Sequence, residues 1–249
     1  MKLHHLDCAP LRPVFPPLQV ATLCTLVDTG GELLLVDTGL GTRDFSAPSA
    51  KIRLFTALTR VGKDATNTAQ HQIAALGYNP RDVQHILVTH LHLDHSGGLP
   101  DFPQAQVHVY GPEYRAAASP GARRRLAYDA RHWQHGPRWC VHEEVEPGAW
   151  FGFDATEVRG IQSATVLMIP LVGHSPGHAG VVIRTERDWL FHCGSALAPG
   201  GLESAMPERI VSAARGQHAR RLRRLATEQA GKVRIIKSHV SLTTLQAGP

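Results

Sequence analysis

The chain has 249 residues, of which 43% are hydrophobic and 19% are charged. This composition excludes a disordered protein, because it can bury a substantial core, and the length fits one large domain. The net charge of +5 is modest. The arginines between 215 and 224 fall in an expected helix that has no interleaved aromatic residues for base stacking, so they are best explained as its solvated face. We therefore expect no nucleic-acid partner.

The sequence also bears on membranes and on the redox compartment. No segment approaches the roughly eighteen apolar residues that a membrane span needs, and the first residues lack the apolar stretch of a signal peptide. The cysteines are far apart and form no C-x-x-C pair: Cys8, Cys24, Cys140 and Cys193. Such spacing is typical of free thiols in a reducing compartment. We expect a cytoplasmic protein with no membrane partner, although the sequence leaves secretion and the oligomeric state open.

The first half of the chain predicts a hairpin, two helices and two strands. Residues 20–27 and 32–37 are apolar runs that flank a turn-forming Asp-Thr-Gly-Gly cluster, a pattern typical of a β-hairpin. Helical spacing follows at about 66–76, with Gly77 as the expected stop. Residues 86–89 and 107–110 then predict strands, and Gly111-Pro112 opens a further helix.

The second half predicts a less regular segment followed by four strands. At about 119–150, aromatic side chains are mixed with Pro and Gly, which indicates a long irregular insertion in a single domain spanning 1–249. Its aromatic residues could roof a cleft or pack the segment onto the core, and the pattern favours neither. The expected strands are 165–171, 179–184, 189–193 and 233–237, with a helix at about 207–230 before the last.

Three imidazoles and a carboxylate follow the strand at 86–89 within a short stretch, at His90, His92, Asp94 and His95. Positions 90 and 92 alternate along extended chain and therefore point the same way, while the next two bend over the strand end. Neutral imidazole is a good Zn²⁺ ligand, and few structural tasks need so many ligand groups together. The motif predicts that one loop serves a metal site.

His-x-His-x-Asp-His after an apolar strand resembles the signature of the metallo-β-lactamase superfamily of hydrolases. Other segments agree in order: Val36-Asp37-Thr38-Gly39 is similar to the family's early hairpin, Gly-His-Ser-Pro-Gly-His at 173–178 to its second histidine motif, and His239 to its last metal histidine. Residues 75–82 are most similar to the branch that contains acyl-homoserine lactone lactonases. The resemblance implies an α/β fold, a four-layer αβ/βα sandwich with metals along one edge between the two sheets.

The resemblance also implies two sets of metal ligands for one or two ions of Zn²⁺, or of iron or manganese. The first set is His90, His92 and His174, and the second is Asp94, His95 and His239. Asp94 is in addition the candidate catalytic residue, which orients the attacking water and moves its proton. Two residues have two interpretations each: Asp37 is either an acceptor behind the ligands or a turn residue, and His178 either orients its loop or faces substrate.

One position departs from the family pattern. Where the superfamily carries a Gly-Asp pair whose carboxylate bridges both metals, this chain has Gly194-Ser195. A neutral serine does not offset the charge of two dications, so we expect the second metal to bind more weakly or to be absent. Cys193 either reaches the site as a thiolate or is a buried structural cysteine. Ala198 stands near the place of a tyrosine expected in the lactonases.

The resemblance implies a metal-dependent hydrolase, with zinc as the expected ion, that acts on a small ester, lactone or thioester through a metal-bound hydroxide. Two alternatives from other classes stay open. One is an iron-dependent redox enzyme on the same scaffold. The other is a catalytically weakened metal-binding protein, which Ser195 motivates.

Overall fold

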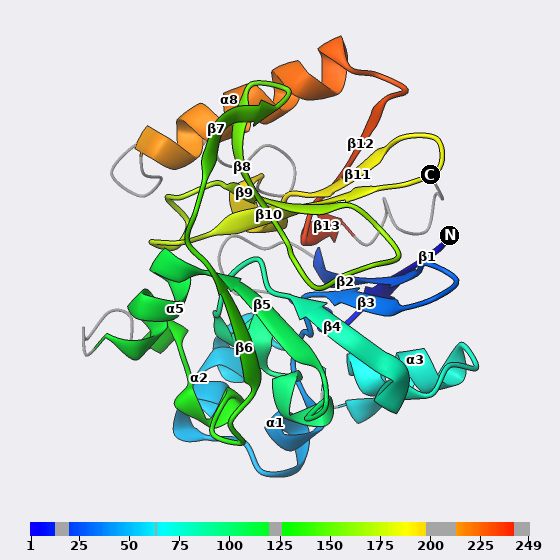
Figure 1. The fold of residues 1–249 in the computed structure, drawn as a ribbon. Helices are drawn as coiled ribbons and strands as arrows, with labels where there is room; N and C mark the ends of the chain where they lie inside the picture. Colours follow the sequence, from blue (N-terminus) through cyan, green and yellow to red (C-terminus); the bar gives the residue numbers. More distant parts are fainter. Residues whose placement is uncertain (13–19, 63, 120–125, 198–212, 242–249) are drawn as a thin grey trace.

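Two β-sheets pack face to face, and helices cover their outer faces (Figure 1). The computed structural model describes residues 1–12, 20–62, 64–119, 126–197 and 213–241. The order of the layers is helix, sheet, sheet, helix, which confirms the four-layer αβ/βα sandwich expected from the sequence. Among the residues that the structure describes, no helix combines the length and apolarity needed to cross a bilayer.

The first sheet has seven strands in the order β1-β2-β3-β4-β5-β6, with β13 paired to β2. Their bounds are β1 Lys2–Asp7, β2 Val20–Asp28, β3 Leu33–Val36, β4 Val83–Leu87, β5 Gln106–Tyr110, β6 Arg138–His142 and β13 His239–Ser241. Strands β1 to β3 are antiparallel, whereas β3 to β6 run parallel. The carboxyl ends of the parallel strands therefore share one edge, where ligands commonly bind.

Helices connect and cover the strands of the first sheet. They are α1 Thr42–Ser46, α2 Ala50–Thr59, α3 Ala69–Ala75, α4 Leu93–Ser96 and α5 Gly111–Ala118, with 3₁₀ turns at Ala65–Asn67, Pro80–Asp82, Leu99–Asp101 and Ala130–His132. Helix α3 begins where the Thr68 side chain accepts a hydrogen bond from the His71 amide, and it ends before Gly77, whose φ is +88°. The hydroxyl cap and the left-handed glycine explain both ends.

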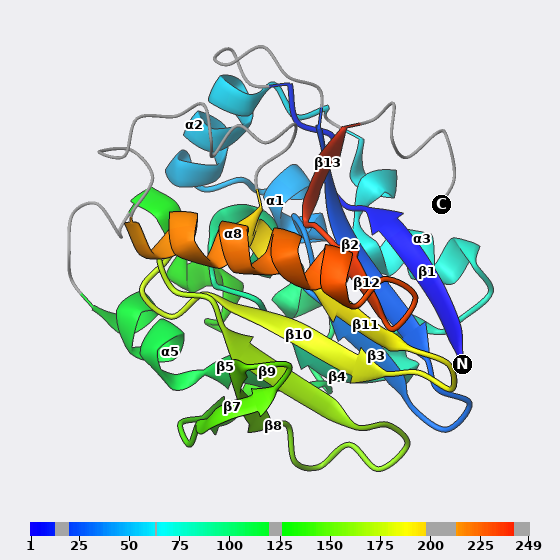
Figure 2. The same cartoon turned by 90° about the horizontal axis from the view of Figure 1, so that it is seen from above.

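The second sheet has six strands in the order β12-β11-β10-β9-β8-β7. The bounds are β7 Glu146–Trp150, β8 Phe153–Glu157, β9 Val166–Pro170, β10 Ala179–Arg184, β11 Trp189–His192 and β12 Val233–Ile236, with a 3₁₀ turn at Gly194–Ala196 after β11. Helix α8, Ala213–Glu228, lies across the outer face of this sheet (Figure 2). It buries Ala219, Leu222 and Leu225 on the sheet, while Arg220, Arg223 and Arg224 are exposed.

Apolar side chains of both sheets fill the space between them. Val27, Leu34 and Leu87 of the first sheet belong to one buried cluster with Met168 and Val181 of the second. Strand β2 is buried on both faces along nearly its whole length, because the partner sheet covers one side and helices cover the other. This double burial explains the near-continuous apolar runs in the sequence.

The hairpin, the helix before Gly77 and the later strands confirm the predictions, but the segment at about 119–150 is more regular than expected. Strands β6 and β7 fall within it, and β6 pairs in parallel with β5. Arg138 and Val141 are exposed and the other three residues of β6 are half-buried, so the strand lacks the regular alternation of buried and exposed positions. Trp139 packs against the first sheet's core and Trp150 against the second's, which favours core packing over a roof for these aromatic residues. Residues 120–125 and 207–212 lie outside the described residues.

Candidate metal centre

The His-x-His-x-Asp-His segment leaves the first sheet at the carboxyl end of β4. His90 lies in the segment after β4, and His92, whose dihedral angles are extended, directly precedes α4. Asp94 and His95 lie within this single helical turn. The change from extended chain to helix sends the two pairs of side chains in different directions, and each pair joins a ligand from elsewhere in the fold.

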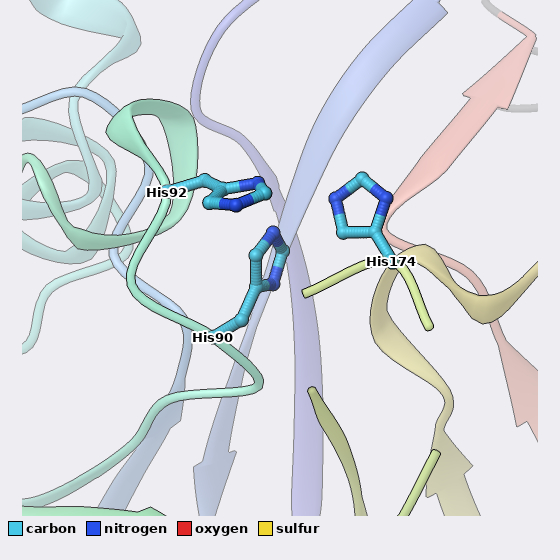
Figure 3. A group of neighbouring side chains, drawn as sticks. All are labelled: His90, His92 and His174. Carbon is cyan, nitrogen blue, oxygen red and sulfur yellow. The ribbon is translucent and has the colours of Figure 1, made fainter. Parts of the chain in front are cut away.

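His90 and His92 meet His174, which lies in the loop between β9 and β10. One ligand atom of each ring lies within 4.8 Å of the others, and Figure 3 shows the three rings pointing toward one another. The ring centroids are 4.4 Å apart for His90 and His92 and 4.7 Å apart for His90 and His174. We call these residues the first ligand group.

The donor set of the first ligand group fits a divalent cation. The Nε2 atom of His90 is buried and has no hydrogen-bond partner among the described residues. A buried polar atom of this kind costs free energy unless something binds it, and an imidazole nitrogen binds Zn²⁺ well. The other ring nitrogen, Nδ1, lies 3.0 Å from the hydroxyl of Thr89.

Asp94 and His95 meet His239, the first residue of β13, and form the second ligand group. Asp94 Oδ2 lies 3.7 Å from His95 Nε2 and 3.6 Å from His239 Nε2. His239 reaches this place because β13 pairs with β2 in the first sheet, although it follows β12 of the second sheet. The ring centroids of His90 and His95 are 4.0 Å apart, so the first and second ligand groups are neighbours.

Burial controls the charges of both groups in the absence of an ion. Burial lowers the pKa of His92 and of His239 to about 4, and burial together with neighbouring histidines lowers the pKa of His90 and His174 well below the usual value. These rings are therefore neutral at pH 7 and keep a lone pair for a cation. Burial alone would raise the pKa of Asp94, but the nearby histidines hold it below its usual value, so this carboxylate is ionised.

Asp37 lies directly behind His95. Its Oδ2 accepts a hydrogen bond from His95 Nδ1 at 2.8 Å, and its Oδ1 accepts one from the Thr89 amide at 2.7 Å. This contact keeps the His95 proton on Nδ1 and leaves Nε2 free to face the second ligand group. Of the two interpretations of Asp37, the geometry favours the acceptor behind the ligands.

His178 uses both ring nitrogens within the protein. Nδ1 donates to the Leu171 carbonyl at 3.1 Å, and Nε2 accepts the Ser195 amide at 3.0 Å. The ring thus joins the β9–β10 loop to the turn after β11, which favours a role in orienting loops. Gly194 allows this approach, since its φ is +57° and a Cβ there would lie 2.5 Å from His178 Nε2.

Cys193 and Ser195 occupy different environments. Cys193 is buried in the apolar cluster beneath α8 and belongs to neither ligand group, which favours a structural cysteine over a thiolate ligand. Ser195 is buried, and its Oγ lies 3.5 Å from His95 Nε2. The side chain that replaces the expected aspartate therefore does face the second ligand group, but without a charge.

Glu113 is the residue near the site that the sequence analysis missed. It is fully buried in the first turn of α5, and its carboxylate contacts both histidine loops. An acidic residue in a first helical turn is common, since it favours the helix dipole. The sequence therefore carried no signal that set Glu113 apart.

A cavity of about 800 Å³ lies elsewhere, between the edges of the two sheets. Residues of β6, of β8 and of the segment before β7 line it, including His142, Glu144 and Glu157. No residue of either ligand group is among its lining residues. This cavity is therefore separate from the candidate metal centre.

Comparisons with known proteins agree with this geometry. The chain is 38% identical over 200 residues to a "probable metallo-hydrolase" of Mycobacterium tuberculosis, and the match covers 79% of this chain but only 62% of that protein. It is 27% identical over 179 residues to an "N-acyl homoserine lactonase" of Bacillus cereus, covering 70% of this chain and 62% of that one. The chain thus spans less than two thirds of the length of these relatives.

Solved structures show the same fold. An N-acyl homoserine lactone hydrolase, solved with N-hexanoyl-L-homoserine at its catalytic metal center, has a TM-score of 0.71 at 20% identity, covering 100% of this chain and 96% of that one. A probable metal-dependent hydrolase from Staphylococcus aureus has a TM-score of 0.69 at 19% identity, covering 96% and 89%. The sequence profile of the "Metallo-beta-lactamase superfamily" matches residues 18–233. With most of its length matched and its two ligand groups assembled at the shared edge of the sheets, the chain belongs to the metallo-β-lactamase superfamily.

Proposed function

We propose that this chain is a zinc-dependent hydrolase of a small ester, lactone or thioester. The observation that carries the proposal is the convergence of His90, His92 and His174, with a buried and unpartnered Nε2 on His90 among the described residues. Relatives described as a metallo-hydrolase and as N-acyl homoserine lactonases support the reaction class.

The first ligand group and the second ligand group would each hold an ion through three side chains. A bound divalent ion supplies acidity to a water molecule, whose pKa falls toward about 7, and it polarises a carbonyl oxygen. Neutral imidazoles suit Zn²⁺, although iron and manganese accept the same mixture of nitrogen and carboxylate ligands. Since Ser195 adds no charge beside His95, we propose that the second group binds its ion more weakly than the first.

Asp94 is the group that we assign to proton movement. It is ionised, buried and within 4 Å of His95 Nε2 and His239 Nε2, so it faces the place where the reacting groups would lie. Its carboxylate would accept the proton of the attacking water and return it to the leaving oxygen or sulfur. Asp37 would not contact the reacting groups itself; it would act through His95, because it holds the His95 proton on Nδ1.

The metal content of the purified chain tests the first half of the proposal. We expect bound zinc in the parent and a loss of zinc in His90→Ala and His92→Ala, measured by elemental analysis. His71→Ala is the matched control, since His71 is an exposed histidine of α3 outside both ligand groups. The proposal is wrong if the parent holds no metal or if all three variants keep the parent's content.

Substrate panels test the second half. We expect turnover of at least one class among small lactones, aryl esters and acyl thioesters, with loss of activity after chelation and recovery on adding Zn²⁺. Failure of every class with a fully metallated sample would contradict the hydrolase assignment. The substrate within these classes, the cytoplasmic location and the lack of a nucleic-acid partner stay predictions.

A further inference from the structure

Glu113 is a buried carboxylate that contacts two separate loops. Oε1 accepts hydrogen bonds from the Leu91 amide and the Tyr128 hydroxyl, both at 2.9 Å. Oε2 accepts hydrogen bonds from the Ser175 hydroxyl at 2.6 Å and the Gly177 amide at 3.1 Å. The residue is completely shielded from solvent. Four donors in a buried place require an acceptor-only group with two oxygens, which an ionised carboxylate provides.

The partners of Glu113 are the immediate neighbours of the first ligand group. Leu91 lies between His90 and His92 in the sequence, and Ser175 directly follows His174. Tyr128 adds a further contact, because its ring packs edge-on against the ring of His92 with centroids 5.1 Å apart. Each histidine of the first group is therefore next to a group that Glu113 holds.

We propose that Glu113 is the positioning residue of the first ligand group, so that one side chain sets the separation of His174 from His90 and His92. The inference rests on the proposed function and deepens it. Asp37 has the corresponding place behind the second group, where it contacts His95 directly. Two buried carboxylates from different elements thus stand behind two neighbouring groups, one carboxylate for each.

The packing around Gly177 supports a fixed distance between the loop and the helix. A Cβ at this position would lie 1.9 Å from the Glu113 backbone nitrogen and 2.6 Å from the Pro112 carbonyl carbon. Only glycine allows the β9–β10 loop to approach the start of α5 so closely. The loop that carries His174 is therefore pressed against the helix that carries Glu113.

The Glu113→Gln variant isolates the charge and the acceptor count without changing the shape. The amide has one oxygen, so its NH₂ group must face either the Leu91 amide or the Gly177 amide, and neither backbone donor can reverse its role. One of the two histidine loops then loses its backbone hydrogen bond to residue 113. We expect Co²⁺ to bind the full-length, EDTA-stripped protein about 10–100-fold more weakly, with an altered visible spectrum of the bound Co²⁺.

Glu32→Gln is the control for the loss of charge. A single oxygen of Glu32, Oε2, accepts hydrogen bonds from the amides of Gln162 and Ser163 and from the Ser163 hydroxyl, so Gln can keep all three, and Glu32 lies outside both ligand groups. We expect this control to leave the affinity and the spectrum of Co²⁺ at the parent's values. Parent-like affinity and spectrum in Glu113→Gln would overturn the inference.

Two further outcomes are distinguishable. If Glu113→Gln does not fold, Ser175→Ala decides the question, because it removes a single donor and leaves three; a loss of Co²⁺ affinity of about threefold to tenfold supports the inference, and no loss overturns it. A parent that binds no Co²⁺ would refute the proposed function itself, and the inference with it.

Discussion

Replacing Asp37 by Asn should move the proton of His95 from one ring nitrogen to the other. The backbone tolerates the change, since Asp37 has a φ of +57° and Asn adopts this left-handed conformation more readily than most residues. The Asn oxygen is needed opposite the Thr89 amide, because a backbone N–H cannot become an acceptor. The Asn NH₂ group then faces His95 Nδ1, which must accept, so that the proton lies on Nε2.

The size of the effect follows from the hydrogen bonds that are lost. Asn keeps the hydrogen bond from the Thr89 amide, and the Thr89 hydroxyl, which donates to Asp37 Oδ2 at 2.8 Å, can turn to accept from the Asn NH₂ group. The charged contact between His95 and Asp37 is lost, which should lower the free energy of unfolding by about 1.5–3 kcal/mol. A protonated Nε2 cannot bind a cation, so the affinity of the second ligand group should fall by about 10–100-fold.

The assay is a Co²⁺ titration of the EDTA-stripped variant, followed by elemental analysis. Asp101→Asn is the control, because the Asp101 carboxylate also accepts a backbone amide and a hydroxyl, both from Thr42, and lies outside both ligand groups. We expect it to lose stability but not metal. Parent-like Co²⁺ affinity and metal content in Asp37→Asn would show that the His95 tautomer does not govern the second group.

Three other predictions follow from the site and the core. Ser195→Asp adds a charge beside the second ligand group and should raise the zinc content toward two ions per chain; an unchanged content by elemental analysis would mean that charge is not what limits binding. In the metal-free protein, burial lowers the pKa of every histidine of the two groups except His95, to about 4 for two of them. Below about pH 6.5 these histidines are protonated in the unfolded chain but stay neutral in the folded chain, so protonation stabilises the unfolded state. The Tm of the EDTA-treated protein should therefore fall as the pH decreases from 7 to 5. A Tm that stays constant or rises over this range would contradict the prediction. Leu222→Ala leaves a cavity at a fully buried position beneath α8 and should lower the free energy of unfolding, measured in urea, by about 2–5 kcal/mol. Leu58→Ala, at a side chain that is 57% exposed, should lower it by less than about 0.5 kcal/mol. Equal losses in the two variants would refute the assignment of the core.

The sequence predicted the fold where the apolar pattern reflected burial on both faces. Strands β2 and β10 are nearly continuous apolar runs because layers cover both of their sides. Strand β6 was missed because it lies at the edge of the first sheet, where partial exposure mixes polar and apolar positions. Pattern alone cannot distinguish such an edge strand from an irregular loop.

Some residues of the candidate site could be identified from the sequence, and others could be identified only from the structure. The residues of the two ligand groups could be named from motifs, and the structure brings all six together as two adjacent sets. Glu113 could not be named, because its importance lies in two loops that meet only in the folded chain. His178 and Cys193 could be assigned only from their partners, which are the backbone around them for His178 and an apolar cluster for Cys193.

The pairing of β13 with β2 has a consequence for biogenesis. His239 approaches Asp94 only after the polypeptide has traversed the second sheet and returned to the first. Contacts between such distant segments form late, because closing a long loop costs chain entropy. An ion at the second ligand group would therefore bind only after the two sheets have assembled, and partly folded intermediates would lack this site.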